Sequence, residues 1–300
     1  MVPEAGNKPG RQKDKQMIND NHIKEIYTLL SEASAAIMEI YESGSFSISQ
    51  KADHSPLTRA DLASNAIITK GLSRITPGIP IISEESLHLP YEERRLFREV
   101  WILDPIDGTR EFVNRNGEFC ISLALIMEGS PVAGFIMAPV TGELWYALEG
   151  QGAWYVKDGK AFRLPLTRTD TEQSAGICSD NDTGAGGGNS RRILITISRS
   201  HHNEREKEWI DIIIDRFGAA TVIQGSALKF CRLAEGASSV YPKLGSINEW
   251  DVAAGDIILR ESGGEIREVT GGEMPKYNKP DLKQPHFIAY ARGIRKLLEE

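Results

Sequence analysis

The sequence predicts a mixed α and β protein whose first half is α+β and whose second half is α/β. Two stretches with helical spacing of apolar residues precede a series of strand-like runs joined by turn residues. Beyond a glycine-rich stretch, strand-like and helix-like segments alternate. With 40% hydrophobic and 26% charged residues, the 300-residue chain has the composition of a globular protein with one large or two ordinary domains.

The first half begins with two predicted helices. Apolar residues recur at helical spacing over 21–41, and Gly44 then offers a C-terminal stop. A second helix is expected over 58–72. Strands are expected over 79–82, 100–103, 119–127, 132–138 and 143–148. Turn residues join the last three strands, so we expect an antiparallel meander.

The second half follows a Gly-, Ser- and Asp-rich stretch at 173–192, which we interpret as a long flexible loop near a domain boundary. The expected segments are a strand at 193–197, a helix at 204–217, a strand at 221–223, a helix at 226–234, a strand at 238–241 and a helix at 251–261. The predicted organisation is a disordered tail at 1–17, an N-terminal α+β domain at 18–168, a flexible loop at 169–192 and a C-terminal α/β domain at 193–300.

Charge and cysteine content narrow the classes of function. The chain has 35 Lys and Arg against 42 Asp and Glu, a net charge of −7, so no overall positive field attracts a nucleic acid polymer. Cys120, Cys178 and Cys231 are far apart and form no C-x-x-C pair, which argues against a disulfide framework or a zinc site. The polar N-terminus lacks a signal-peptide core, and no apolar run spans a bilayer, so we expect a cytoplasmic chain without a transmembrane segment.

Acidic residues gather where predicted elements end or begin. Glu84 and Glu85 follow one strand, Asp104 and Asp107 follow the next, and Asp251 opens a helix. Carboxylates brought together repel one another unless a cation neutralises them. Oxygen ligands without His or Cys suit a hard divalent ion, Mg²⁺ before Mn²⁺ or Ca²⁺. The pattern therefore predicts a carboxylate metal site.

The run Asp-Pro-Ile-Asp-Gly-Thr suits phosphate chemistry. Pro105 stiffens the turn, so Asp104 and Asp107 can face one point. Gly108 and Thr109 then offer backbone N–H groups for a phosphate oxygen, together with a hydroxyl. Two Mg²⁺ ions about 3.5–4 Å apart would activate a water and stabilise the leaving oxygen of a phosphate ester.

Structural explanations remain open at the same positions. They are a plain turn at Asp107-Gly108, a solvated strand end at Glu84-Glu85 and a helix cap at Asp251. The sequence Thr58-Arg59-Ala60-Asp61 fits a capping box, which by itself would explain Asp61. Spacing alone does not choose between these roles and a metal site.

Together, the three acidic segments resemble the signatures of the inositol monophosphatase superfamily, whose members are Mg²⁺-dependent, lithium-sensitive phosphatases. The matching segments are Ser83-Glu84-Glu85, the run from Trp101 to Thr109, and Glu249-Trp250-Asp251, in the same order and spacing. Within this superfamily the chain is most similar to the bacterial CysQ branch, the 3′(2′),5′-bisphosphate nucleotidases. The supporting segments lie at 51–58, 115–119, 197–201 and 225–231. The resemblance covers 20–292 and leaves out the tail and the loop at 173–192.

The resemblance implies a layered αβαβα sandwich with the active site between two subdomains. It implies hydrolysis of the 3′-phosphate of adenosine 3′,5′-bisphosphate to AMP and phosphate, with 3′-phosphoadenylyl sulfate as a further substrate. The implied cofactor is Mg²⁺, as two or three ions. The implied metal ligands are Glu84, Asp104, the Ile106 carbonyl, Asp107 and Asp251. The implied catalytic residues, which orient or activate the attacking water, are Asp61, Glu85 and Thr109.

The substrate contacts that the resemblance implies fall into two groups. Around the scissile phosphate they are Glu84, Ile106, Asp107, Gly108, Thr109 and Asp251. On the 5′-phosphate side they are Ser200, His201, Ser226, Lys229 and Lys243. Lys243 stands where related sequences often carry Arg, and it lacks the bidentate fork of a guanidinium. An exposed pair at His201-His202 and a solvated helix residue at Lys229 remain the structural alternatives.

Two other functions stay open. One is hydrolysis of inositol or another sugar monophosphate, against which the segments at 198–201 and 225–230 argue. The other is a non-catalytic nucleotide or metal sensor, against which the filled ligand positions argue. The expected partner is a small nucleotide bisphosphate. The sequence leaves a homodimer and peripheral attachment to the inner membrane open, and it offers no evident amphipathic anchor.

Overall fold

The computed structural model of the protein describes residues 18–44, 49–50, 56–86, 88–167, 192–199 and 203–300. The predicted tail at 1–17 and residues 169–191 of the predicted loop lie outside the described residues, and so do Ser200 and His201. Among the helices that are described, none is both long and apolar enough to cross a membrane.

Two long helices, α1 (Asp20–Ser43) and α2 (Arg59–Ile75), lie side by side. The Asn19 side chain caps the start of α1, and Gly44 ends it with a φ of 70°. The capping box predicted at Thr58 and Asp61 is confirmed at the start of α2. The apolar face of each helix points to the same sheet, which fixes the first two layers of the fold.

That sheet has seven strands in the order β3-β4-β5-β6-β7-β8-β9. The strands are β3 (Ile81–Ser83), β4 (Glu99–Asp107), β5 (Cys120–Met127), β6 (Ser130–Ala138), β7 (Glu143–Leu148), β8 (Gly152–Lys157) and β9 (Lys160–Arg163). Strands β3 and β4 pair in parallel, and the other pairs are antiparallel. The predicted meander is confirmed in β5, β6 and β7 and continues through β8 and β9, which were not predicted. Short elements around it are β1 (Ser49–Gln50), β2 (Pro56–Leu57), α3 (Tyr91–Arg94) and α4 (Thr109–Val113).

A second sheet, built from the C-terminal half, has five strands in the order β11-β10-β12-β14-β13. The strands are β10 (Leu194–Ile197), β11 (Ala220–Ile223), β12 (Val240–Lys243), β13 (Glu265–Glu268) and β14 (Phe287–Tyr290). The helices of this half are α6 (Glu204–Phe217), α7 (Leu228–Glu235), α8 (Ala253–Glu261) and α9 (Ile294–Glu299). Parallel pairing of β10 with β11 and β12 agrees with the predicted alternation of strands and helices.

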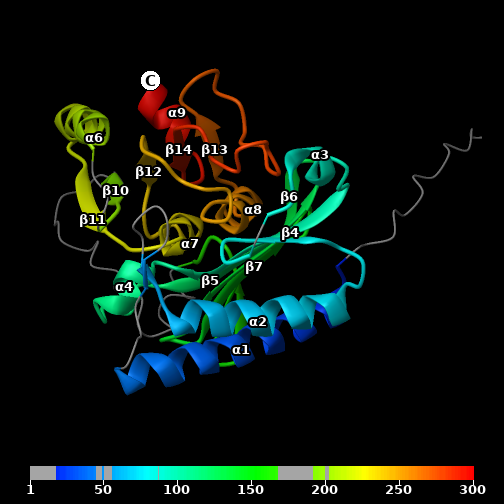
Figure 1. Ribbon diagram of the computed structural model, residues 1–300. Helices are drawn as coiled ribbons and strands as arrows, with labels where there is room; N and C mark the ends of the chain where they lie inside the picture. Colours follow the sequence, from blue (N-terminus) through cyan, green and yellow to red (C-terminus); the bar gives the residue numbers. More distant parts are fainter. Residues whose placement is uncertain (1–17, 45–48, 51–55, 87, 168–191, 200–202) are drawn as a thin grey trace, which may run out of the picture.

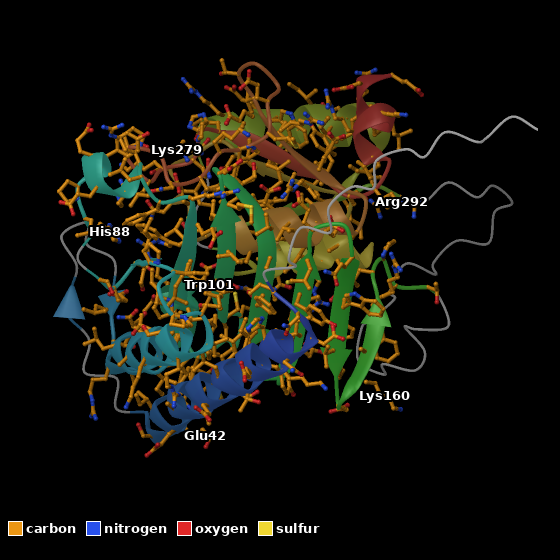
Figure 2. All side chains as sticks on the ribbon, turned by 90° about the vertical axis from the view of Figure 1, so that its right-hand side faces the viewer. Glu42, His88, Trp101, Lys160, Lys279 and Arg292 are labelled. Atoms are coloured by element: carbon orange, nitrogen blue, oxygen red, sulfur yellow. The ribbon has the colours of Figure 1, made fainter. Side chains whose placement is uncertain are left out.

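The elements stack in five layers (Figure 1). Helices α1 and α2 cover the outer face of the seven-stranded sheet, α7 and α8 fill the space between the two sheets, and α6 and α9 cover the five-stranded sheet. In Figure 2, Trp101 lies in the lower part of this stack, where its indole donates to Thr76 Oγ1 at the end of α2. The layers confirm the predicted αβαβα sandwich.

Several predicted boundaries are wrong near the ends of elements. The strand expected at 100–103 spans Glu99–Asp107, so Asp104 and Asp107 lie within β4 and do not follow it. The helix expected at 226–234 begins at Leu228, because Ser226 has a φ of 52° and belongs to the preceding turn. The helix expected from Asp251 begins at Ala253, and the strand expected at 238–241 spans Val240–Lys243. These shifts place Ser226 and Asp251 in the turns before α7 and α8, and they place Lys243 at the end of β12.

Candidate active site

The end of β4 brings Asp104 and Asp107 to the same place. In the pairing of β4 with β5, Asp104 lies opposite Ser122 and Asp107 opposite Cys120, so β4 contains one extra residue between them. The buried Ser64 hydroxyl donates to the Pro105 carbonyl at 2.9 Å and ties this bulge to α2. The Ile106 N–H donates to Asp104 Oδ1 at 3.0 Å, which fixes the first carboxylate.

Asp251 reaches this point from the other half of the chain. The Ser122 hydroxyl of β5 donates to the Trp250 carbonyl at 3.0 Å and holds the neighbouring backbone. Val252 occupies the N-cap position of α8, while Asp251 Oδ2 accepts the Asn248 N–H at 2.9 Å. A helix cap therefore does not explain Asp251.

The three aspartates form a compact cluster. Carboxylate oxygens of Asp104, Asp107 and Asp251 all lie within 4.8 Å of one another. Glu84 is next to them, because its N–H donates at 3.1 Å to the carbonyl of Leu103, the residue before Asp104. This arrangement is more than a plain turn at Asp107 or a solvated strand end at Glu84.

Burial makes this cluster costly to ionise. It raises the pKa of Asp104 well above its usual value, and repulsion from Glu84, Asp107 and Asp251 raises that pKa further. Burial and the charge of Asp251 raise the pKa of Asp107 to about 8, against the opposing effect of Lys229. Burial raises the pKa of Asp251 to about 6. A divalent cation would remove this repulsion, and the oxygen-only donor set fits Mg²⁺.

Asp61 and Thr109 meet behind the cluster. Asp61 is fully buried, and its Oδ2 accepts from the Thr58 N–H at 2.8 Å and from the Thr58 hydroxyl at 2.6 Å. Its other oxygen, Oδ1, accepts the Thr109 hydroxyl at 3.2 Å. Thr109 Oγ1 also lies 3.2 Å from the Ile106 carbonyl oxygen. One carboxylate thus serves both the capping box and the site.

A cavity of about 390 Å³ opens over the cluster. The predicted residues that line it are Glu84, Asp104, Ile106, Asp107, Gly108, Thr109, Ser226, Lys229, Lys243 and Asp251. Asp61 and Glu85 are not part of this lining; Asp61 lies behind Thr109, and Glu85 follows the lining residue Glu84. A Cβ at Gly108 would lie 3.2 Å from the Glu118 carbonyl oxygen and from Ser226 Cβ, and its φ of 93° also favours glycine.

Two buried lysines stand in the same cavity. Lys229 is 7% exposed and Lys243 is 6% exposed, so a solvated helix residue is the wrong interpretation of Lys229. Lys229 Nζ donates to the Ser226 carbonyl at 2.5 Å and lies 5.2 Å from the centre of the Tyr241 ring. Burial lowers the pKa of Lys229, while the charge of Asp107 opposes this change.

Several residues of the cavity were not predicted from the sequence. They are Arg110, Glu111, Ser198, Arg199, Gly225, Ala227, Phe230, Tyr241, Ser246, Ile247 and Asn248. The Ala227 N–H donates to Asp107 Oδ2 at 2.5 Å. Every residue except proline has a backbone N–H, so the residue type of Ala227 does not indicate this hydrogen bond. Only its position in the segment at 225–231 could have indicated it.

The chain was compared with families of known proteins. The family model described as the inositol monophosphatase family matches residues 19–299. The chain belongs to the inositol monophosphatase family. Metal dependence is general to this family, in agreement with the oxygen-only cluster.

Individual members of the family resemble the chain over most of its length. The 3′(2′),5′-bisphosphate nucleotidase CysQ of Salmonella typhimurium is 33% identical over 266 residues, which cover 88% of this chain and 98% of that protein. The crystal structure of CysQ from Bacteroides thetaiotaomicron superposes with a TM-score of 0.75 at 33% identity, covering 91% of this chain and 97% of the other. A structure of an IMPase/NADP phosphatase with Mg²⁺ and phosphate, 18% identical, shares the fold with a TM-score of 0.68 and covers 93% of each chain.

Proposed function

We propose that the protein is a Mg²⁺-dependent 3′(2′),5′-bisphosphate nucleotidase that converts adenosine 3′,5′-bisphosphate to AMP and phosphate. The observation that carries this proposal is the meeting of an aspartate cluster and two buried lysines in one cavity. A nucleotide with two phosphates on its ribose, one at the 3′ and one at the 5′ position, matches this pairing of a metal site with a second anion site. The similarity to CysQ proteins supports the same substrate class.

The aspartate cluster would hold the metal. Asp104, Asp107, Asp251 and Glu84 would supply carboxylate oxygens and Ile106 a carbonyl oxygen to two or three Mg²⁺ ions. When bound, Mg²⁺ lowers the pKa of a water and polarises the phosphate oxygens. The N–H groups of Gly108 and Thr109 would hold the scissile phosphate next to the metal ions, on the side that faces the cavity.

Asp61, Thr109 and Glu85 would prepare the attacking water. Asp61 accepts the Thr109 hydroxyl and so fixes the direction of the remaining lone pairs of Thr109 Oγ1. Thr109 and Glu85 would hold the water in line with the 3′ P–O bond and accept its proton. A new P–O bond forms from the water, the bond to the 3′ oxygen breaks, and a proton returns to that oxygen to give AMP.

The buried lysines would select the nucleotide. Lys229 and Lys243 are nine-tenths buried in the cavity wall, where a phosphate dianion gains more from each charge than it would at the surface. Ser226 would add its hydroxyl on the 5′-phosphate side. Ser200 and His201 are proposed as further contacts from the resemblance alone. A sugar monophosphate lacks the second phosphate and leaves the second anion site empty.

Lys229→Ala tests this assignment. We expect kcat/KM for adenosine 3′,5′-bisphosphate to fall about a hundredfold, and kcat/KM for p-nitrophenyl phosphate to fall much less, because only the former has a second phosphate. Lys160→Ala serves as the matched control, since Lys160 is exposed on β9, far from α7 (Figure 2). Equal losses on both substrates, or a wild-type preference for inositol 1-phosphate, would contradict the nucleotidase assignment.

A further inference from the structure

The carboxylate of Glu118 joins its own segment to two segments that line the cavity, at Arg199 and at Gly225. Glu118 lies between α4 and β5, on the metal-binding side of the molecule. Its Oε1 accepts from Arg199 Nη2 at 2.7 Å, and its Oε2 accepts from Arg199 Nε at 2.8 Å. The same Oε2 accepts the Gly225 N–H at 2.9 Å. Both oxygens are therefore used, and both partners come from the C-terminal half.

The two partners of Glu118 belong to the substrate side of the cavity. Arg199 follows β10 and lines the cavity, and Gly225 opens the turn that leads into α7. In that turn the Ser226 carbonyl accepts Lys229 Nζ, and the Ala227 N–H donates to Asp107. The position of Gly225 thus determines where the ammonium of Lys229 and the N–H of Ala227 point.

The turn has a backbone conformation that needs support from outside it. Ser226 has a φ of 52°, in the left-handed region that residues with a side chain rarely adopt. Gly225 leaves no room for movement toward the metal side, because a Cβ there would lie 2.8 Å from Glu111 Cγ and from the Glu118 carbonyl oxygen. Such a backbone persists only where its surroundings fix it, and the Glu118 carboxylate supplies a direct hydrogen bond.

We propose that Glu118 is a positioning residue that holds the Arg199 segment and the 225–229 turn against the metal-binding half, so that the second anion site is complete. This inference rests on the proposed function for its substrate. Glu118 acts through Gly225, Arg199 and Lys229, and it does not itself meet the scissile phosphate. Its side chain is 22% exposed, and the guanidinium of Arg199 is its bidentate partner.

Three substitutions separate the contacts of Glu118. Glu118→Ala removes both hydrogen-bonded partners. Glu118→Gln keeps one oxygen for Gly225 but turns an amide NH₂, which cannot accept, toward the guanidinium. Arg199→Lys keeps the positive charge and removes the fork. Glu265→Gln is a matched control, because Glu265 on β13 also accepts from two arginines, Arg267 and Arg295, outside the cavity.

Two readouts test the proposal. In Glu118→Ala we expect faster amide exchange over 225–227 and a KM for adenosine 3′,5′-bisphosphate raised about tenfold, with a smaller rise for p-nitrophenyl phosphate. Glu118→Gln and Arg199→Lys should give intermediate KM values, and Glu265→Gln should match the wild type. Retained exchange protection together with an unchanged KM would overturn the proposal. Equal rises in both KM values with a lowered melting temperature would also overturn it, because they indicate general loss of structure.

The proposed function and this inference fail in different ways. If the wild type does not hydrolyse adenosine 3′,5′-bisphosphate, the proposed function is wrong. The exchange measurement needs no substrate, so it still shows whether Glu118 holds the turn. Faster exchange in Glu118→Ala would then support the positioning role, and unchanged exchange would overturn it.

Discussion

Asp104 combines near-complete burial with a place among three other carboxylates. It is 2% exposed, and its pKa is raised by burial and by the charges of Glu84, Asp107 and Asp251. An aspartate in such a place destabilises the metal-free protein and is useful only where a cation or a proton neutralises it. This cost of burying the charge, which a bound cation would offset, distinguishes a metal ligand from an ordinary buried polar residue.

Asp104→Asn should remove activity without loss of the fold. The amide oxygen can still accept the Ile106 N–H, and the loss of charge relieves repulsion in the cluster. We expect Mg²⁺-dependent phosphate release to fall by at least about a hundredfold, while the melting temperature without metal stays equal or rises. Asp211→Asn, on the exposed face of α6, is the control and should behave as the wild type. Near-normal turnover in Asp104→Asn would remove this residue from the metal site.

The site residues that could be predicted are those whose side chains carry the chemistry. Asp104, Asp107 and Asp251 follow from residue type and position at element ends, and the structure brings their carboxylates together. The role of the Ala227 N–H and the pair of Glu118 with Arg199 depend on contacts more than 80 residues apart in the sequence. Local patterns contain no information about such contacts.

The two helices between the sheets pack closely because one of them has a glycine at the contact. A Cβ on Gly255 of α8 would lie 2.3 Å from Cδ2 and 2.4 Å from Cγ of Phe230 on α7. Phe230 is 1% exposed, and its ring packs against the rings of Tyr241 and Phe287, so it cannot shift without disturbing these contacts. The helix that follows Asp251 is therefore fixed in place against α7 by the absence of a side chain.

Gly255→Ala should lower the free energy of unfolding by about 1–3 kcal/mol, because overpacking outweighs the better helix propensity of alanine. Gly71→Ala is the comparison, since it is the same change inside α2, where the nearest atoms belong to the Leu29 side chain, which lines an open groove into which it can turn. We expect that variant to stay within about 1 kcal/mol of the wild type. Denaturant titration of both proteins measures the difference, and equal effects would contradict the packing argument.

Elements with a strong local signal could be predicted, and those defined by tertiary contacts could not. Helices α1 and α2 have amphipathic periodicity and caps, so their bounds follow from sequence within a few residues. Strands β8 and β9 were missed, although Asp158-Gly159 between them is a typical hairpin turn with positive φ at both residues. The short strands β13 and β14 acquire their structure from pairing with β12 and with each other.

At the scale of the whole molecule, the site joins the two halves of the chain. Strand β4 and helix α2 belong to the first half, while Lys229, Lys243 and Asp251 come from the second. No local pattern predicts that α8 packs against both sheets, and this part of the fold was expected only from the family resemblance. We propose the domain limits 18–168 and 193–300 on this basis, with the active site at their junction.

The charge cluster predicts how pH and Mg²⁺ together affect stability. The pKa values of Asp107 and Asp251 are raised in the folded state, so the metal-free folded protein binds more protons than the unfolded chain. The stability that these groups contribute is fully present below their unfolded pKa of about 4. It is lost as the pH rises through about 6 for Asp251 and about 8 for Asp107.

Mg²⁺ should therefore stabilise the protein more at high pH than at low pH, because it competes with these protons. At one fixed Mg²⁺ concentration, about a hundred times the Kd at pH 8.5, the melting temperature should rise by about 4 °C near pH 8.5. The same concentration should raise it by less near pH 5.5. Thermal unfolding with and without Mg²⁺ at matched ionic strength measures this. In Asp104→Asn the pH dependence should be weaker. An equal rise at both pH values in the wild type would contradict the role of the cluster.

Phosphate release from adenosine 3′,5′-bisphosphate, measured with Mg²⁺ and with excess EDTA, tests the proposed nucleotidase activity directly. We expect rapid release of one phosphate with AMP as the other product in Mg²⁺, and no release in EDTA. Folded protein that releases no phosphate in Mg²⁺, or that releases it equally well in EDTA, would contradict a metal-dependent bisphosphate nucleotidase.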